Sequence, residues 1–380
     1  MLTSKPNICT MSSLLPRAIL STTLLIAGLI PSPSHGQGCV ASRGAGLPTG
    51  ISGLHGGLMG EHSDAASKWQ AAVGYRWLHS DRHFVGDVEQ VHRQNEGSEV
   101  INDSHFTDLS ISYNFTPRYS ATLTLPFVYH DRSSTARSND VARTILERFH
   151  TQSAGLGDIR VNGNMWLWDP TKPRKQNILL GFGIDAPTGK KNAKDTFRVF
   201  RTPNVVNEER NVDQSIQPGD GGWGFTIDMY GYQQIAPRLS AYVNGSYTFT
   251  PQEKNGVLTS RNNIFESEMS IADSYMGRAG LEFVVWPKHG VTVSLGGRIE
   301  GVPVHDAFGG SEGFRRPGYG ISIEPGISAM LKSWSFSLYT PVAVSRMRER
   351  SKPDKMTSAV AHGDAAFADF LVMFNVSKRF

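Results

Sequence analysis

The 380-residue sequence has no long apolar run after Ile30. A membrane-spanning helix needs about 20 consecutive apolar residues, so a helical membrane protein is excluded for the rest of the chain. Cysteine is also scarce, since only Cys9 and Cys39 occur, and Cys9 falls in an expected leader. The mature chain would keep one cysteine, which excludes an internal disulfide.

An excess of one charge sign is also lacking. The formal net charge is +4, and acidic and basic residues are mixed throughout. This balance gives no footprint for nucleic acid, so we expect no nucleic-acid partner. His79 and His83 are four residues apart, but a third ligand at fixed spacing is missing. We therefore expect neither a metal site nor a cofactor.

The N-terminus has the pattern of an export signal. Lys5 and Arg17 precede an apolar run at 18–30, and small residues stand at 34 and 36. We expect a cleaved signal peptide at 1–36, with an uncleaved anchor as the weaker alternative. The Gly-rich segment 37–67 is either a periplasmic lead or a plug folded into a lumen. Residues 68–380 form the third expected part, a barrel.

Alternating apolar and polar residues recur through the remaining chain. In one segment, Leu109, Ile111 and Tyr113 alternate with Ser110 and Ser112. Such alternation over about ten residues is typical of membrane β-strands that show one face to lipid. The expected strands are 68–79, 105–116, 118–131, 154–169, 174–187, 221–236, 237–250, 271–286, 289–302, 317–332, 334–348 and 364–380.

The connections between these strands alternate between short and long. Five short turns, four of them with proline, alternate with six long loops. This asymmetry predicts an all-β fold, an antiparallel up-and-down transmembrane barrel of about 12 strands. Its short turns would be periplasmic and its long loops extracellular. A soluble periplasmic β-sandwich is the rival fold. Residues 141–150 could form a short amphipathic helix, and 188–220 is the loop best suited to fold inward.

Aromatic residues gather near the expected strand ends. Trp166, Trp168, Trp286 and Trp334 would form an inner girdle, with an outer one at Trp77, Tyr129 and Trp223. The final strand also alternates, and it resembles the C-terminal signature that assembly machinery reads in outer-membrane barrels. We expect an assembly signal at Phe374, Val376 and Phe380, with the barrel-assembly machinery and outer-membrane lipid as partners.

The strand parity places a set of charged residues inside the barrel, eight acidic and four basic. These lumen-lining candidates are Arg76, Asp108, Asp158, Arg160, Asp185, Asp228, Arg278, Glu282, Arg298, Glu300, Glu324 and Asp369. One interpretation is a structural network of ion pairs. The other is a polar conduit with a mild preference for cations or polar solutes.

An outer-membrane enzyme is a third possibility. Twelve-stranded phospholipases need a serine, a histidine and a polar orienting group near the outer rim. His130 is followed by Ser133 and Ser134, but nothing in the sequence completes a triad. We expect no catalytic site.

Three glycine-containing segments carry a family resemblance. They are Ala154 to Val161 (AGLGDIRV), Ala186 to Lys190 (APTGK) and Gln217 to Gly221 (QPGDG). They resemble a transporter-like outer-membrane barrel family named for the meta-pathway of phenol degradation. The resemblance implies an outer-membrane location and passage of small molecules. We expect a monomeric channel or transporter for small solutes, with hydrophobic or aromatic solutes as candidates. An occluded structural or adhesive barrel that binds a partner through its loops is the alternative.

Overall fold

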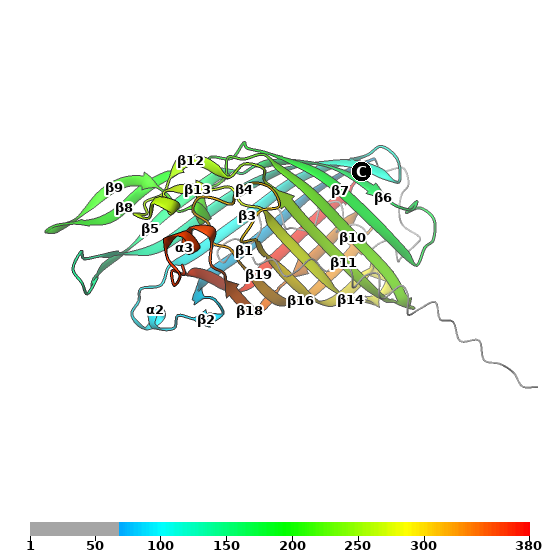
Figure 1. Ribbon diagram of the computed structural model, residues 1–380. Coiled ribbons are helices and arrows are strands. Elements are labelled where there is room, and N and C mark those ends of the chain that lie inside the picture. Colours follow the sequence, from blue (N-terminus) through cyan, green and yellow to red (C-terminus); the bar gives the residue numbers. More distant parts are fainter. Residues whose placement is uncertain (1–67) are drawn as a thin grey trace, which may run out of the picture. The chain divides into compact units, whose positions relative to one another are not determined.

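The fold was obtained as a computed structural model that describes residues 68–380. The expected signal peptide and the 37–67 segment lie outside the described residues. Within 68–380 the chain forms a closed, antiparallel, 12-stranded barrel, which confirms the expected fold (Figure 1). Two of the twelve strands are interrupted, so they carry two labels each. In chain order the strands are β1 (Trp69–Val85), β3 (Ile101–Asn114), β4 (Tyr119–Arg137), β5 with β6 (Ile145–Leu156, Ile159–Trp166), β7 (Gln176–Ala186), β10 (Gly224–Ala236), β11 (Leu239–Phe249), β14 (Ser274–Trp286), β15 (Val291–Val302), β16 (Gly318–Leu331), β17 with β18 (Trp334–Tyr339, Val342–Arg348) and β19 (Ala365–Arg379).

The barrel closes where its last strand pairs with its first. β19 pairs with β1 in an antiparallel register that sets Tyr75 opposite Phe374. The backbone N–H of Trp69 donates to the carbonyl of Phe380 at 3.1 Å, and the reverse bond measures 3.0 Å. Closure leaves no exposed sheet edge, which is the condition for a sheet to cross lipid.

The two faces of the wall differ as the alternation predicts. On β3, Leu109 and Ile111 are each 41% exposed, whereas Ser110 and Ser112 are almost fully buried. The buried hydroxyls bond across the strands, and Ser112 meets Thr122 on β4 at 2.8 Å. The exposed apolar side chains therefore form the lipid-facing surface, and the polar ones line the interior.

Smaller elements occupy the loops. They are β2 (Val88–Glu89), α2 (His92–Asn95), β8 (Lys194–Arg201), β9 (Asn204–Asn211), η2 (Gln214–Ile216), β12 (Lys254–Leu258), η3 (Ile264–Glu266), β13 (Glu268–Ser270), η4 (Pro287–His289) and α3 (Lys352–Thr357). No helix within 68–380 has both the length and the apolar character to span a membrane. The β8–β9 hairpin lies beside β5, where Phe149 and Phe197 contact each other (Figure 1).

Two local expectations were wrong. Residues 145–150 of the expected helix belong to β5, which pairs with β4 from Arg137 down to Phe127. The free edge of β4 supplies backbone partners along this stretch, and a ten-residue helix is marginal without tertiary support. Trp166 does not join the expected inner girdle. It shares the parity of Arg160 and is 7% exposed, because it packs in an apolar cluster inside the barrel.

Candidate functional site: a polar cavity in the lumen

A cavity of about 200 Å³ lies inside the barrel. Its wall comes mainly from the inner faces of β1, β3, β4, β6, β7 and β10, and residues of β17, β19 and the loop segments 214–222 and 269–274 also line it. Six of the twelve predicted lumen residues line it, together with Asp220, which the parity argument missed. The charged lining residues are Arg76, Asp108, Asp158, Arg160, Asp185, Asp220 and Asp228.

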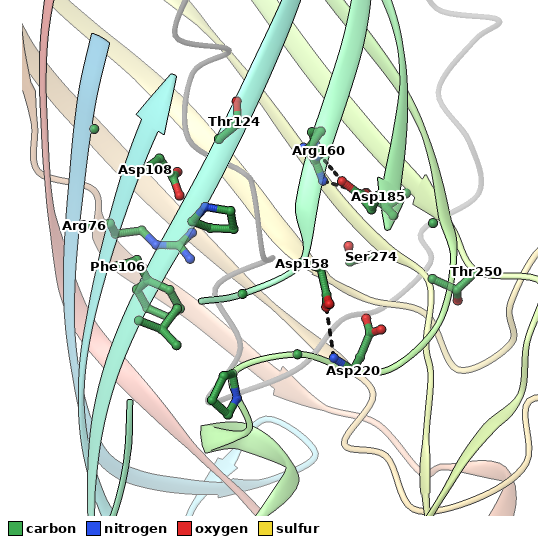
Figure 2. Close-up of a pocket in the computed structure, with 18 of the residues that line it drawn as sticks. Arg76, Phe106, Asp108, Thr124, Asp158, Arg160, Asp185, Asp220, Thr250 and Ser274 are labelled. Carbon is green, nitrogen blue, oxygen red and sulfur yellow. Dashed lines mark hydrogen bonds and ion pairs between the residues drawn. The ribbon is translucent and has the colours of Figure 1, made fainter. Parts of the chain in front are cut away.

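Arg76 and Asp108 form one side of the cavity. They lie on the adjacent strands β1 and β3 (Figure 2). The guanidinium carbon of Arg76 lies 4.2 Å from the centre of the Phe106 ring, a cation–π geometry. The side-chain carboxylate of Asp108 accepts no hydrogen bond from any residue of 68–380, and its charged neighbours are Arg76 and Arg160. Its carboxylate is thus available to a solute.

The other side carries a tightly paired set of charges. Arg160 on β6 forms a two-pronged ion pair with Asp185 on β7, in which Nη2 donates to Oδ2 at 2.9 Å (Figure 2). Thr226 also donates to Asp185 at 3.0 Å. On β10, Asp228 accepts a hydrogen bond of 2.9 Å from Asn162. Charge-assisted pairs of this kind fix their side chains, so this wall is rigid.

Asp158 joins the three segments that carry the family resemblance. It lies in the break between β5 and β6, where its Oδ1 accepts from the N–H of Gly189 at 2.9 Å. Its Oδ2 accepts from the N–H of Asp220 at 3.0 Å (Figure 2). Thr188 donates from its hydroxyl to the carbonyl of Gly157 at 3.0 Å. We call this set of contacts the latch.

Close backbone contact in the latch requires glycine. A Cβ on Gly189 would lie 2.6 Å from the Cα of Gly219, and a Cβ on Gly219 would lie equally close to Gly189. No side chain fits at such distances. The three motifs were separate signals in the sequence, and the structure shows that they meet because the two ends of the 187–223 loop pass each other beside the break between β5 and β6.

Part of the longest loop covers the cavity. Residues 214 and 217–220 line it, while the β8–β9 hairpin of the same loop does not. The inward fold expected of 188–220 thus applies only to its C-terminal part. Gln217 is buried, and its amide donates to the carbonyls of Ala193 and Val212 at 3.2 and 3.0 Å.

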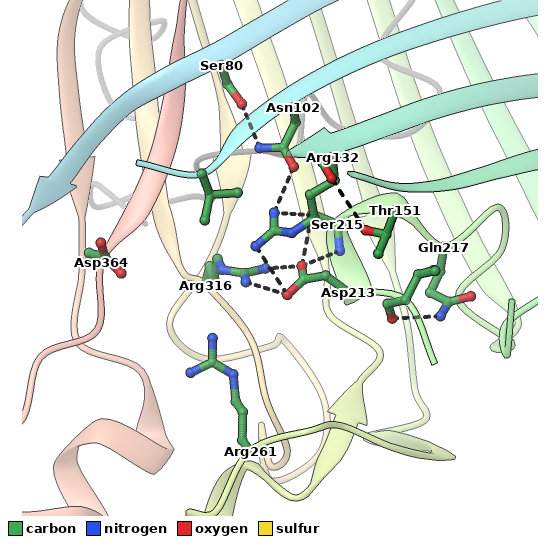
Figure 3. A network of polar contacts seen from close by, with 12 residues as sticks. Ser80, Asn102, Arg132, Thr151, Asp213, Ser215, Gln217, Arg261, Arg316 and Asp364 are labelled. Atoms are coloured by element: carbon green, nitrogen blue, oxygen red, sulfur yellow. Dashed lines mark hydrogen bonds and ion pairs between the residues drawn. The ribbon is translucent and has the colours of Figure 1, made fainter. Parts of the chain in front are cut away.

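Loops that are distant in sequence are tied together by Asp213. Arg316 donates two hydrogen bonds of 2.7 Å to its carboxylate, and Arg132 lies 3.6 Å away (Figure 3). Arg132 also donates to Asn102 at 2.7 Å and to Ser215 at 3.2 Å. Burial alone would raise the pKa of Asp213, but the two arginines hold that pKa well below its ordinary value. We call these ion-paired loops the roof.

A second carboxylate supports the roof nearby. Asp364 pairs with His83 at 2.9 Å and with Arg93 at 2.8 Å. Its burial opposes ionisation, yet the hydrogen bond from His83 and the charge of Arg93 lower its pKa.

Arg261 and Arg316 both stack on the ring of Phe314, at 3.8 and 4.7 Å from its centre.

The other six predicted lumen residues lie away from the cavity. Arg278 and Arg298 pair with Glu324 at 2.7 and 3.3 Å, and Arg298 also pairs with Glu300 at 2.8 Å. Glu282 is 2% exposed beside this network. Asp369 pairs with Arg82 at 2.7 Å and with Arg346 near the loops. The structural interpretation thus fits the network around Glu324, whereas the conduit interpretation stays a prediction for the residues that line the cavity.

The predicted assembly signal lies on the final strand. Phe374 and Phe380 are 42% and 57% exposed, and Val376 shares the outward parity of Phe374. Recognition by assembly machinery stays a prediction, as does the role of the cavity residues in solute passage.

His130 has a serine partner, but not at an accessible place. Its Nδ1 lies 2.8 Å from the hydroxyl of Ser104, which stands directly across on β3. Both residues are almost fully buried, at 2% and 3% exposure. In the part of the chain that the structure describes, no group of three His, Cys, Asp or Glu residues is arranged to hold a metal ion. The buried pair of His130 and Ser104 is thus a structural contact between β3 and β4.

Comparison with known proteins supports the fold. No protein-family model and no curated protein matches the sequence. An outer membrane channel from Pseudomonas putida F1 has a similar structure, with a TM-score of 0.52 and 10% identity over 84% of this chain and 97% of that chain. The P. putida toluene transporter TodX gives a TM-score of 0.43 at 10% identity, covering 92% and 99% of the two chains. The translocator domain of the autotransporter NalP from Neisseria meningitidis gives 0.43 at 11%, covering 87% and 93%. Only the first similarity is strong enough to support the fold, an outer-membrane-type barrel.

Proposed function

We propose that this protein is a monomeric outer-membrane channel or transporter that passes small solutes, hydrophobic or aromatic ones among them. The observation that carries the proposal is the cavity inside a closed, lipid-compatible barrel. Its volume is below the ~300–1,000 Å³ of pockets for drug-sized ligands, which suits a small solute. The P. putida F1 protein with the similar fold is called an outer membrane channel, which supports this proposal.

The cavity wall suits solutes of mixed character. Apolar side chains of Phe106, Pro126, Val128 and Met269 line it beside the charged ones. An apolar surface favours the body of an organic solute, and fixed polar groups orient it. The family resemblance, which links such barrels by name to phenol degradation, agrees with an aromatic solute.

Location and assembly belong to the same proposal. We propose export by a signal at 1–36, a lead or plug at 37–67, and insertion in the outer membrane by the barrel-assembly machinery. The exposed Phe374 and Phe380 on the closing strand support recognition by that machinery.

Bilayer conductance and liposome swelling test the channel. The full mature chain, folded into liposomes, should admit a small sugar such as arabinose and should give discrete conductance steps. A folded barrel that conducts nothing and admits no solute would refute the proposal. Folding is checked independently by the heat-dependent shift in gel mobility that closed barrels give.

One variant separates the channel from the adhesive alternative. The β8–β9 hairpin projects from the cavity-covering loop without lining the cavity, so residues 195–210 can be replaced by a short glycine linker. A channel should keep its conductance after this change. A barrel that works by loop adhesion should instead lose binding to cells or envelope while never conducting.

A further inference from the structure

The charges that line the cavity do not balance. Five aspartates face two arginines, which leaves a surplus of three negative charges. In an interior with a low effective dielectric constant, such a surplus attracts cations far more strongly than it would in water. The roof offsets only part of this surplus, because Arg132, Arg261 and Arg316 are paired there with two carboxylates, those of Asp213 and Glu266.

A row of polar side chains crosses four neighbouring strands on the inner face. The register sets Asp108 beside Gly74, Gly74 beside Asn375, and Asn375 beside Ser337. All four residues line the cavity. A Cβ on Gly74 would lie 3.4 Å from Asn375 Nδ2 and 3.7 Å from Asp108 Cβ, so the missing side chain leaves space between these polar groups.

The row has hydrogen-bonding capacity that the described residues do not use. Asp108 accepts no hydrogen bond from them, as noted above. The hydroxyl of Ser337 is buried, with 2% of the residue exposed, and has no hydrogen-bond partner within 68–380. A buried polar group without a partner is costly, so a solute that supplied a hydrogen-bond partner to this hydroxyl would be favoured.

The next row of the same four strands is largely apolar. It consists of Phe106, Arg76, Met373 and Tyr339, in that order across the wall. The guanidinium of Arg76 is stacked on the ring of Phe106. Phe106, Met373 and Tyr339 therefore offer an apolar and aromatic surface directly beside the polar row.

We propose that these two rows form a binding site for small organic cations, with an ammonium group at Asp108 and Ser337 and an apolar body against Phe106, Met373 and Tyr339. An ammonium has three N–H donors and no acceptor, which matches a carboxylate and a hydroxyl oxygen facing one space. The site rests on the proposed channel function and names the class of solute that the channel prefers. Arg76 is the cation nearest the site, and it opposes binding of the ammonium. The surplus of carboxylates outweighs this single charge.

Calorimetric titration of the full chain, folded in detergent micelles, tests the site with three ligands of one shape. At neutral pH these are benzylammonium, benzyl alcohol and benzoate, which differ in charge. We expect benzylammonium to bind about tenfold more tightly than benzyl alcohol, with benzoate weakest. Benzoate binding as tightly as benzylammonium would overturn the proposal and would indicate an anion site at Arg76.

Two nearly isosteric variants locate the site. Asp108→Asn should weaken benzylammonium binding about tenfold without changing benzyl alcohol binding. Ser337→Ala should weaken it by a smaller factor, and it serves as the second test if the first variant fails to fold. Asp169→Asn, which makes the same charge change in a periplasmic turn where Asp169 bonds only locally to Thr171, is the control. Unchanged affinity in both cavity variants would overturn the proposal.

Permeation separates this inference from the proposed function. In bilayers with a salt gradient, the reversal potential should show a preference for cations, and Asp108→Asn should reduce it. A barrel that conducts without this preference would overturn the cation site and leave the channel standing. A barrel that binds benzylammonium at Asp108 but conducts nothing would refute the channel and leave the binding site standing.

Discussion

The backbone N–H of Gly189 donates a hydrogen bond of 2.9 Å to the carboxylate of Asp158, which lies in the break of the fourth strand, between β5 and β6. The same carboxylate holds the N–H of Asp220, so one side chain joins the barrel wall to both ends of the cavity-covering loop. No backbone ladder joins β5 to β7, because β5 pairs with β4 and the partners of β7 are β6 and β10. The latch takes the place of those missing backbone bonds.

Replacing Asp158 with alanine should release the covering loop. The change leaves two backbone N–H groups without an acceptor, at a cost of about 1–3 kcal/mol for each one that stays buried. We expect faster proteolytic cleavage within 187–220 and a higher or noisier conductance, while the barrel stays closed. Asp169→Ala, in a solvated turn, should change neither property. Equal cleavage rates in the two variants would contradict the role given to the latch.

Replacing Gly219 with alanine should damage the same place by crowding. The added methyl group would meet the backbone of Gly189 at 2.6 Å, and backbone cannot move aside cheaply. Overpacking of this kind costs about 1–3 kcal/mol. Gly163→Ala on β6 is the matched control, because a Cβ there meets nothing within 4 Å. Thermal unfolding in detergent should separate the two variants, and equal midpoints would count against close packing at the latch.

Replacing Asp213 with asparagine should open the roof. The change leaves Arg132 and Arg316 in a buried site without their shared carboxylate, and breaking a buried ion pair costs about 3 kcal/mol. Hydrogen exchange in the segments around residues 212–220 and 314–317 should increase. Asp140→Asn, in the exposed tip between β4 and β5, changes the same charge without breaking an ion pair and should leave exchange unaltered.

The roof should respond to acid but not to mild changes of pH. Asp213 and Asp364 have lowered pKa values in the folded chain, so they bind protons less readily than in the unfolded chain. Their stabilisation is therefore complete above the ordinary aspartate pKa of about 3.9 and is lost as the pH falls further. Conductance should be constant from about pH 5 to pH 8 and should increase below about pH 4. An increase already between pH 7 and pH 5 would contradict control of the roof by these two carboxylates.

Much of the fold followed from local patterns in the sequence. The alternation in segments such as Leu109 to Tyr113 arises because each strand has one face toward the polar lumen and one toward lipid. The number of strands and the residues that point inward were therefore predictable. The stretch 141–150 was not, because its own pattern suits a helix and the outcome depends on the edge of β4 beside it. Trp166 was misplaced for a related reason. Proximity to a turn suggested the girdle, whereas its parity with Arg160 places it inside.

The site was predictable only in its chemistry. Parity identified the charged interior. It could not show that Asp108 and Asp228 line an open cavity, whereas Arg298 and Glu324 form a buried ion pair away from that cavity. That difference depends on the sizes of side chains on strands far apart in sequence. The ion pair of Asp213 with Arg316 joins residues 103 positions apart, and no local pattern reports such a contact. The glycine motifs did mark the latch, although nothing in their spacing showed that they meet.

The buried network of Arg278, Arg298 and Glu324 occupies β14, β15 and β16, on the part of the barrel that does not line the cavity with charges. The buried ion pairs and the proposed solute site therefore lie on separate arcs of one cylinder. A laboratory evolution campaign could diversify the inner positions of β3, β6 and β10 and keep the other arc fixed as a frame. In evolution, the inner positions of β3, β6 and β10 could change the preferred solute while the ion pairs of β14, β15 and β16 stay unchanged.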